Sequence, residues 1–149
     1  MLLASACLLG LGCRYDGRSK PLPQLVELLK LGQVMPVCPE QLGGLSTPRA
    51  RSEIVGGTGE DVLEGKARVL TETGTDVTCQ FIRGAMECLY LARQVNPELI
   101  VLCDGSPSCG STRIADGTFS GRKVAGKGVC AALLCKHGFQ VCPSERFGR

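Results

Sequence analysis

The sequence has no tryptophan, and aromatic residues make up only 4% of it, so its hydrophobic core must be aliphatic. It also lacks an excess of charge of either sign. With 17 basic and 14 acidic side chains the net charge is +3, and the longest run of basic residues is the pair Arg122-Lys123. This balance of charges does not predict a binding surface for polymeric nucleic acid, although a small anionic or polar substrate is compatible with it.

No hydrophobic run is long enough to cross a membrane. Residues 1–12 are apolar, but they lack a basic start, fall short of the roughly 20 residues that a bilayer requires, and are followed by Cys13-Arg14. We therefore expect a buried strand and a loop here, no membrane partner and a cytoplasmic location. A chain of 149 residues can bury a substantial core, and we expect one domain over residues 1–149.

Ten cysteines are the outstanding feature, and none of them forms a Cys-x-x-Cys pair. A disulfide scaffold fits poorly, because such scaffolds are short and loop-rich, whereas several of these cysteines lie in apolar periodic segments. In a reducing compartment, clustered thiols indicate a metal site or catalysis instead. Spacing alone leaves metal binding and simple thiol packing equally open.

Short apolar runs alternate with helical patterns along the chain. Alternation of this kind predicts an α/β fold, with a short parallel sheet flanked by helices and ligands bound beyond the carboxyl ends of the strands. Residues 39–65 are rich in Gly, Arg and Glu and predict a long functional loop. We expect strands at 2–6, 34–37, 67–71, 99–103 and 139–142, and helices at 21–31, from 76 or 78 to about 95, and at 129–136.

Three cysteines follow predicted strands, namely Cys7, Cys38 and Cys109. Because the carboxyl ends of parallel strands meet at one edge of a sheet, we expect the three thiols to converge there. Thiolates are soft ligands suited to iron–sulfur clusters, zinc and copper(I), and three of them leave one metal position open. An open position is typical of a catalytic site.

Several short motifs follow one another in a distinctive order and together cover nearly the whole chain. The motifs are Ser5-Ala6-Cys7-Leu8-Leu9-Gly10, Cys13-Arg14-Tyr15-Asp16-Gly17, Cys38-Pro39-Glu40, Gly43-Gly44-Leu45, Pro48-Arg49, Ser106-Pro107-Ser108-Cys109-Gly110, Asp116-Gly117-Thr118-Phe119-Ser120-Gly121 and Gly126-Lys127-Gly128-Val129. The ordered set resembles the thiouracil desulfidase family. That resemblance implies a Rossmann-like domain with a 4Fe-4S cluster on three cysteines, one iron being open to take sulfur from a thiolated pyrimidine such as 2-thiouracil in a non-redox hydrolysis.

The resemblance also assigns roles to particular residues. It places the cluster ligands at Cys7, Cys38 and Cys109, and an acid/base carboxylate at Glu40. A carboxylate two residues beyond a cluster ligand is well placed to take a proton from the attacking water. The partner implied is a small thiolated nucleobase, and the products are the oxo base and hydrosulfide.

The family's catalytic serine falls at Ser106 or Ser108, and the sequence does not distinguish the two. Arg14 and Arg49 are candidates for holding an anionic substrate or the hydrosulfide product by charge-assisted hydrogen bonds. The chain departs from the family pattern at Ala115, where an aromatic residue is usual, so a ring-stacking contact to the substrate is missing from that position.

Simpler interpretations stand beside these. Glu40 can merely form an ion pair with a loop arginine, Arg49 or Arg51, and Cys13 can be a bystander thiol instead of a fourth ligand. A non-enzymatic cluster or sulfur carrier and a zinc-stabilised α/β module are the alternatives for the whole chain. The cysteines within predicted helices and strands are interpreted as packing; they are Cys79, Cys88, Cys103, Cys130, Cys135 and Cys142.

Overall fold

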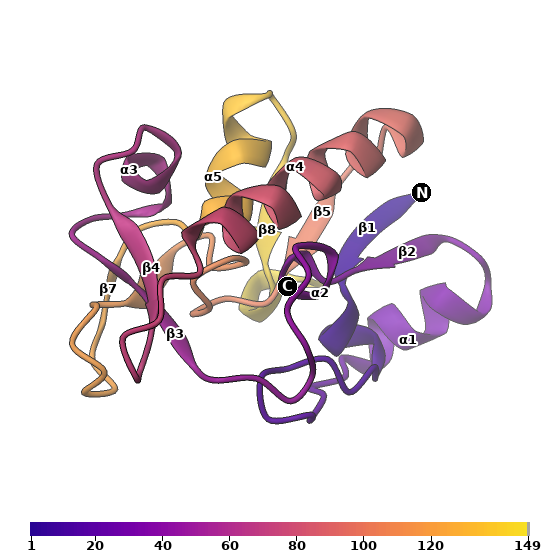
Figure 1. The fold of residues 1–149 in the computed structure, drawn as a ribbon. Helices are drawn as coiled ribbons and strands as arrows, with labels where there is room; N and C mark the ends of the chain where they lie inside the picture. The colour runs from indigo at the N-terminus through magenta and orange to yellow at the C-terminus, as the bar shows by residue number, and fades with distance from the viewer. Residues whose placement is uncertain (149) are drawn as a thin grey trace.

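The structure is a computed structural model that describes residues 1–148. Its centre is a four-stranded, fully parallel sheet with the strand order β2-β1-β5-β8 (Figure 1). The predicted α/β fold with a short parallel sheet is confirmed. The four strands are β1 (Leu2–Ser5), β2 (Val34–Val37), β5 (Ile100–Leu102) and β8 (Val141–Pro143).

Helices cover both faces of this sheet. The chain moves from β1 outward to β2 and then back across β1 to β5 and β8, so right-handed crossovers place the first helix on one face and the later helices on the other. The two later helices pack against each other (Figure 1). The helices are α1 (Pro23–Lys30), α4 (Thr78–Val95) and α5 (Val129–Lys136).

The core between these layers is aliphatic, as the composition predicts. Phe81 on α4 is the largest fully buried side chain, and around it pack leucine, isoleucine, valine and alanine from the sheet and helices. Cys88 on α4 and Cys130 on α5 are completely buried in this layer, which agrees with their interpretation as packing residues. Among residues 1–148 no helix is long and apolar enough to cross a membrane.

The prediction of a single long loop over residues 39–65 was wrong. Part of the segment forms a strand that pairs antiparallel with the strand expected at 67–71, and this hairpin stands apart from the parallel sheet. The strand escaped detection because it buries two polar residues, Ser52 and Glu53, which break the apolar pattern. The elements are α2 (Pro39–Leu42), β3 (Ser52–Val55), α3 (Gly59–Leu63) and β4 (Arg68–Thr71).

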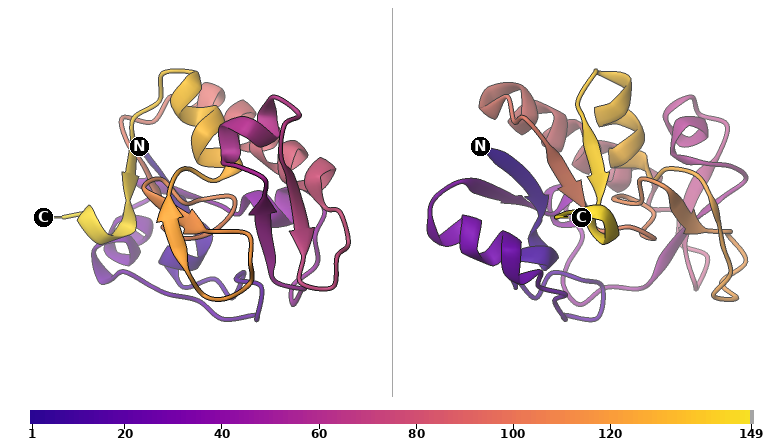
Figure 2. Two further views of the ribbon diagram at one scale, coloured as in Figure 1. Left: turned by 90° about the vertical axis from the view of Figure 1, so that its left-hand side faces the viewer. Right: turned by 180° about the vertical axis from the view of Figure 1, so that it is seen from behind.

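A second hairpin, of β6 (Arg113–Ala115) and β7 (Lys123–Ala125), occupies the glycine-rich stretch before α5. Figure 2 shows it beside the β3–β4 hairpin, and a Cβ on Gly117 would lie only 2.6 Å from the carbonyl oxygen of Ile54. The two hairpins therefore form a side wall next to the carboxyl edge of the sheet.

Three of the four parallel strands end shortly before a loop that carries one of the predicted cysteines. β1 ends at Ser5, one residue earlier than expected, and the short helix η1 (Ala6–Leu9) carries Cys7. β2 is followed directly by Cys38, the residue before α2. β5 is followed by the loop that contains Cys109. The three sequence-distant cysteines thus meet at one edge of the sheet.

Two glycines fix the position of α2, and hence of the residues that follow Cys38. A Cβ on Gly84 of α4 would lie 1.8 Å from the carbonyl oxygen of Pro39, and one on Gly43 would lie 2.0 Å from that of Gln80. The two backbones touch directly, which only glycine permits.

We expect Gly84→Ala to lower the free energy of unfolding by about 2 kcal/mol, because the added methyl group must displace the Pro39 peptide. The same displacement moves Glu40 and should lower activity. Urea titration measures the first effect. Met86→Ala, at an exposed position of the same helix, is the control and should change stability by less than about 0.5 kcal/mol. Wild-type stability of Gly84→Ala would contradict the close contact.

Candidate active site

A cavity of about 330 Å³ opens at the carboxyl edge of the sheet, between the strand-end loops and the side wall of hairpins. Half of the ten cysteines line it, and all ten carry free thiols. The sequence-predicted site residues all lie in this lining, together with Ala115 from β6 and one aromatic side chain, Tyr15. The five cysteines are Cys7, Cys13, Cys38, Cys103 and Cys109.

Four of these thiols form a connected chain. Contacts with the thiols of Cys103 and Cys13, together with burial, raise the pKa of Cys7. Contacts with Cys38 and Cys7 lower the pKa of Cys13, while the contact with Cys13 and burial raise the pKa of Cys38. The four thiols therefore lie next to one another, and a metal that binds them must displace their protons.

Cys109 is buried, and burial raises its pKa to about 12. The hydroxyl of Ser5 donates a hydrogen bond to its sulfur at 3.4 Å and accepts one from the backbone N–H of Cys103 at 2.9 Å. Ser5 therefore ties the end of β1 to the end of β5 beneath the cysteines. The sequence signal for this role is a single hydroxyl residue at the end of an otherwise apolar strand. No role was predicted for Ser5 from the sequence.

Cys103 was interpreted as packing within a strand, and this was wrong in one respect. β5 ends at Leu102, so Cys103 is the first residue of the loop and lines the cavity beside Cys7. A run of apolar residues does not reveal where the last ladder hydrogen bond falls.

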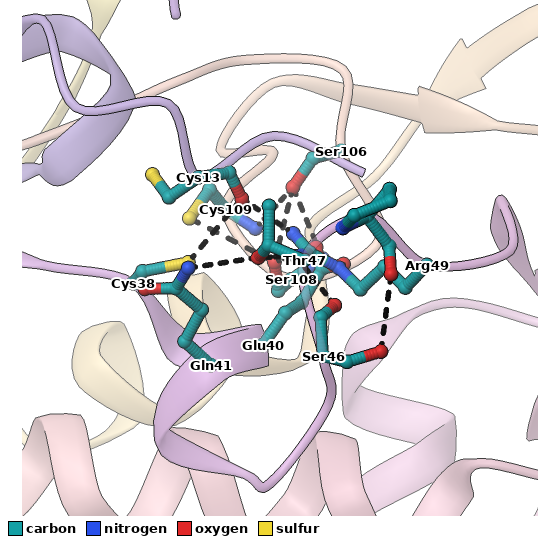
Figure 3. Close-up of polar contacts among 11 residues, drawn as sticks. Cys13, Cys38, Glu40, Gln41, Ser46, Thr47, Arg49, Ser106, Ser108 and Cys109 are labelled. Atoms are coloured by element: carbon teal, nitrogen blue, oxygen red, sulfur yellow. Dashed lines mark hydrogen bonds and ion pairs between the residues drawn. The ribbon is translucent and has the colours of Figure 1, made fainter. Parts of the chain in front are cut away.

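Glu40 sits in the first turn of α2 with both carboxylate oxygens engaged (Figure 3). Arg49 Nε donates to Oε1 at 2.9 Å, and Ser108 Oγ donates to Oε2 at 2.8 Å. The side chains of Arg49 and Glu40 are 7% and 15% exposed. The simpler interpretation of an ion pair with Arg49 is therefore correct as far as it goes, but the second oxygen faces the serine loop.

Arg49 is held by several backbone and side-chain acceptors besides Glu40. Its Nη2 donates to the carbonyl oxygen of Cys13 at 2.8 Å, and its Nη1 donates to Thr47 Oγ1 at 2.8 Å. These bonds fix the guanidinium against the carboxylate and link three loops. Arg14 also lines the cavity, and its side chain makes no hydrogen bond or ion pair within residues 1–148.

The two candidate serines play different parts in the loop. Ser106 Oγ accepts the backbone N–H of Cys109 at 2.7 Å and that of Ser108 at 3.2 Å, so it shapes the turn that carries Cys109. The two hydroxyl oxygens lie 3.1 Å apart. Ser108 is 2% exposed and Ser106 is half-buried. A continuous path therefore runs from Ser106 through Ser108 to Glu40.

The turn beyond Cys109 is anchored by Asp104. Its carboxylate accepts backbone N–H groups from Ser111 at 2.9 Å and Thr112 at 3.1 Å, together with the Thr112 hydroxyl. Burial raises the pKa of Asp104, but the hydrogen bonds from Thr112 and Ser111 outweigh it and lower the pKa overall. The serine loop is thus closed by a fixed, ionised side chain.

The cysteine thiols around the cavity are suitable ligands for an iron–sulfur cluster. Within residues 1–148 no three histidine, cysteine or acidic side chains converge closely enough to hold a single ion, and the thiols surround a cavity instead. Sulfurs spread around a cavity suit a cluster, whose cysteine ligands bind different iron atoms.

Comparison with known proteins decides the family. The family model for 2-thiouracil desulfurase matches residues 2–146. The chain belongs to this family. It is 47% identical over 141 residues to the uncharacterised protein YbbK of Bacillus subtilis (strain 168). The aligned region covers 95% of this chain and 93% of YbbK.

A solved structure of the 4Fe-4S-dependent thiouracil desulfidase TudS has the same fold, with a TM-score of 0.87 and 42% sequence identity. The match covers 98% of this chain and 91% of that chain. The family resemblance and the fold predicted from the sequence are therefore both confirmed.

Proposed function

We propose that this chain is a 4Fe-4S-dependent thiouracil desulfidase, a single-domain enzyme that converts a thiolated pyrimidine into its oxo base and releases hydrosulfide. Membership of the 2-thiouracil desulfurase family and the likeness to TudS support this assignment. The observation that carries it in this molecule is the cysteine-lined cavity with the Glu40–Ser108 hydrogen bond at its wall.

The cluster ligands we propose are Cys7, Cys38 and Cys109. They come from three separate loops at the carboxyl edge of the sheet, so they can surround a cluster from three sides. Cys13 and Cys103 then remain neighbouring thiols. When bound, the cluster supplies an iron that no cysteine occupies and that acts as a Lewis acid on the thiocarbonyl sulfur.

Glu40 is the proposed general base. The reaction consumes one water, forms a carbon–oxygen bond, breaks the carbon–sulfur bond and yields hydrosulfide and a proton. Arg49 holds Glu40 Oε1, which leaves Oε2 directed toward the serines. A proton from the attacking water therefore passes to Oε2, directly or through the Ser108 hydroxyl.

Ser106 is the proposed serine in contact with the substrate. It is the more exposed of the two. Because the Ser108 hydroxyl donates its proton to Glu40, the Ser106 hydroxyl donates to Ser108 Oγ, and a bound substrate can accept that Ser106 proton instead. Ser108 links Ser106 to Glu40. Arg14, whose side chain has no partner within residues 1–148, is the residue we propose for the anionic product, whereas Arg49 serves mainly to position Glu40.

The test is turnover of 2-thiouracil under anaerobic conditions. The enzyme should release one hydrosulfide for each oxo base over many cycles and without a reductant. Sulfur release that stops after one equivalent per cluster would replace this proposal with a sulfur carrier. Zinc in place of iron in the anaerobically purified protein would replace it with a zinc-stabilised module. Cys79→Ala, at an exposed thiol on α4, is the control and should retain full activity.

A further inference from the structure

A buried carboxylate on β3 lines the cavity and has no part in the mechanism above. Glu53 is 2% exposed, and its Oε1 accepts the backbone N–H groups of Gly117 and Phe119, each at 3.0 Å. Its second oxygen, Oε2, takes no hydrogen bond within residues 1–148. One half of the carboxylate therefore anchors a loop, and the other half is an acceptor available to a molecule in the cavity.

Arg51 lines the same cavity two residues earlier. Side chains two apart on a strand share a face, and the ladder with β4 extends to Arg51, whose carbonyl oxygen accepts the N–H of Glu72 at 3.0 Å. The guanidinium makes one long hydrogen bond, 3.5 Å, to the carbonyl oxygen of Phe119, and its Nε is buried without a partner among the described residues. Arg51 Nε is therefore a buried donor without an acceptor among residues 1–148, and it can donate to a molecule in the cavity.

Both side chains contact Phe119. The Arg51 guanidinium lies 5.8 Å from the centre of the Phe119 ring, and the Phe119 backbone is bound by Glu53. Gly117 adopts φ +90° and packs directly on the backbone of β3, where a side chain would collide. The wall thus presents a donor, Arg51, and an acceptor, Glu53 Oε2, from the same strand segment to the cavity.

We propose that Arg51 and Glu53 recognise one edge of the pyrimidine ring, with Glu53 Oε2 accepting the N3–H and Arg51 donating to the adjacent oxo group. This inference rests on the proposed function and extends it to specificity. N3 lies between C2 and C4, so a 2-thio and a 4-thio pyrimidine both present an N3–H beside their remaining oxo group. A ring without the N3–H leaves the buried carboxylate without a donor and is rejected.

The test is equilibrium binding of oxo bases to the cluster-loaded protein, measured by anaerobic calorimetry. The wild type should bind 3-methyluracil at least tenfold more weakly than 1-methyluracil, by about the cost of one lost hydrogen bond. The reason is that 3-methyluracil has no N3–H, whereas 1-methyluracil keeps it. Glu53→Gln keeps an oxygen for the two loop N–H groups but turns a donor toward the cavity. It should retain wild-type iron content, bind uracil about tenfold more weakly, and prefer 1-methyluracil over 3-methyluracil by less than about threefold.

The matched control is Glu145→Gln, which alters another carboxylate at the cavity wall and should preserve the wild-type preference between the two methylated bases. Equal binding of both by the wild type, or a preference that survives in Glu53→Gln, would overturn the inference. Absence of any uracil binding by the wild type would also overturn it. These experiments use no turnover, so a protein that binds uracil with this preference but desulfurates nothing would count against the proposed function alone.

Discussion

Replacement of Cys38 by alanine should reduce iron from about four to fewer than one atom per chain and lower desulfuration at least about a hundredfold. Cys38 lies between β2 and α2, so its sulfur and the carboxylate of Glu40 are placed by the same turn. With the proposed ligand set, this change removes one of three protein bonds to the cluster. Iron and sulfide analysis of the anaerobically purified variant measures the effect.

The other cavity thiols make this prediction specific. Cys7→Ala and Cys109→Ala should behave like Cys38→Ala, whereas Cys13→Ala and Cys103→Ala should keep most of their iron even though both thiols touch Cys7. Full iron content and activity in Cys38→Ala would contradict the ligand assignment. So would loss of iron in Cys13→Ala with retention in Cys7→Ala.

Replacement of Glu40 by glutamine should lower kcat by about a hundredfold to ten-thousandfold while leaving iron content unchanged. Glutamine matches the shape of the side chain and its amide oxygen still accepts from Arg49, but the amide cannot take a proton. Single-turnover kinetics with 2-thiouracil separate this effect from slower binding. Alanine at this position would leave the largely buried Arg49 guanidinium without an acceptor, whereas glutamine keeps one, so glutamine is the variant that should leave the surrounding loop in place.

Variants of the residues hydrogen-bonded to Glu40 should show how much each of them contributes to activity. Ser108→Ala removes the hydroxyl between Ser106 and Glu40 and should cost less than Glu40→Gln, because water can replace the missing link. Arg49→Lys should lower both iron content and activity, since it loses the bond to the Cys13 carbonyl oxygen. Wild-type kcat in Glu40→Gln would exclude Glu40 as the base.

The place of the site could be predicted from the sequence because it depends on the topology of the sheet. Wherever a parallel sheet forms, the residues after its strands meet at one edge, so the convergence of Cys7, Cys38 and Cys109 followed from the apolar runs before them. The identity of the cluster did not follow from spacing, since thiolates suit several metals. That part came from the ordered motifs and is supported by the likeness to TudS.

Features that depend on long-range hydrogen bonds could not be found in this way. Nothing local to Glu40 indicates that Arg49 and Ser108 will hold its two oxygens from different loops. The strand around Glu53 was missed for a related reason, because a buried carboxylate in a strand looks like part of a polar loop until its partners at Gly117 and Phe119 are known.

The most direct test of the account is the rate of hydrosulfide release from 2-thiouracil measured against iron content in samples reconstituted to different degrees. The account predicts a rate proportional to the number of intact clusters per chain, with no turnover in the iron-free protein, and one oxo base formed for each hydrosulfide. An iron-free protein that desulfurates at the rate of the loaded one would contradict it.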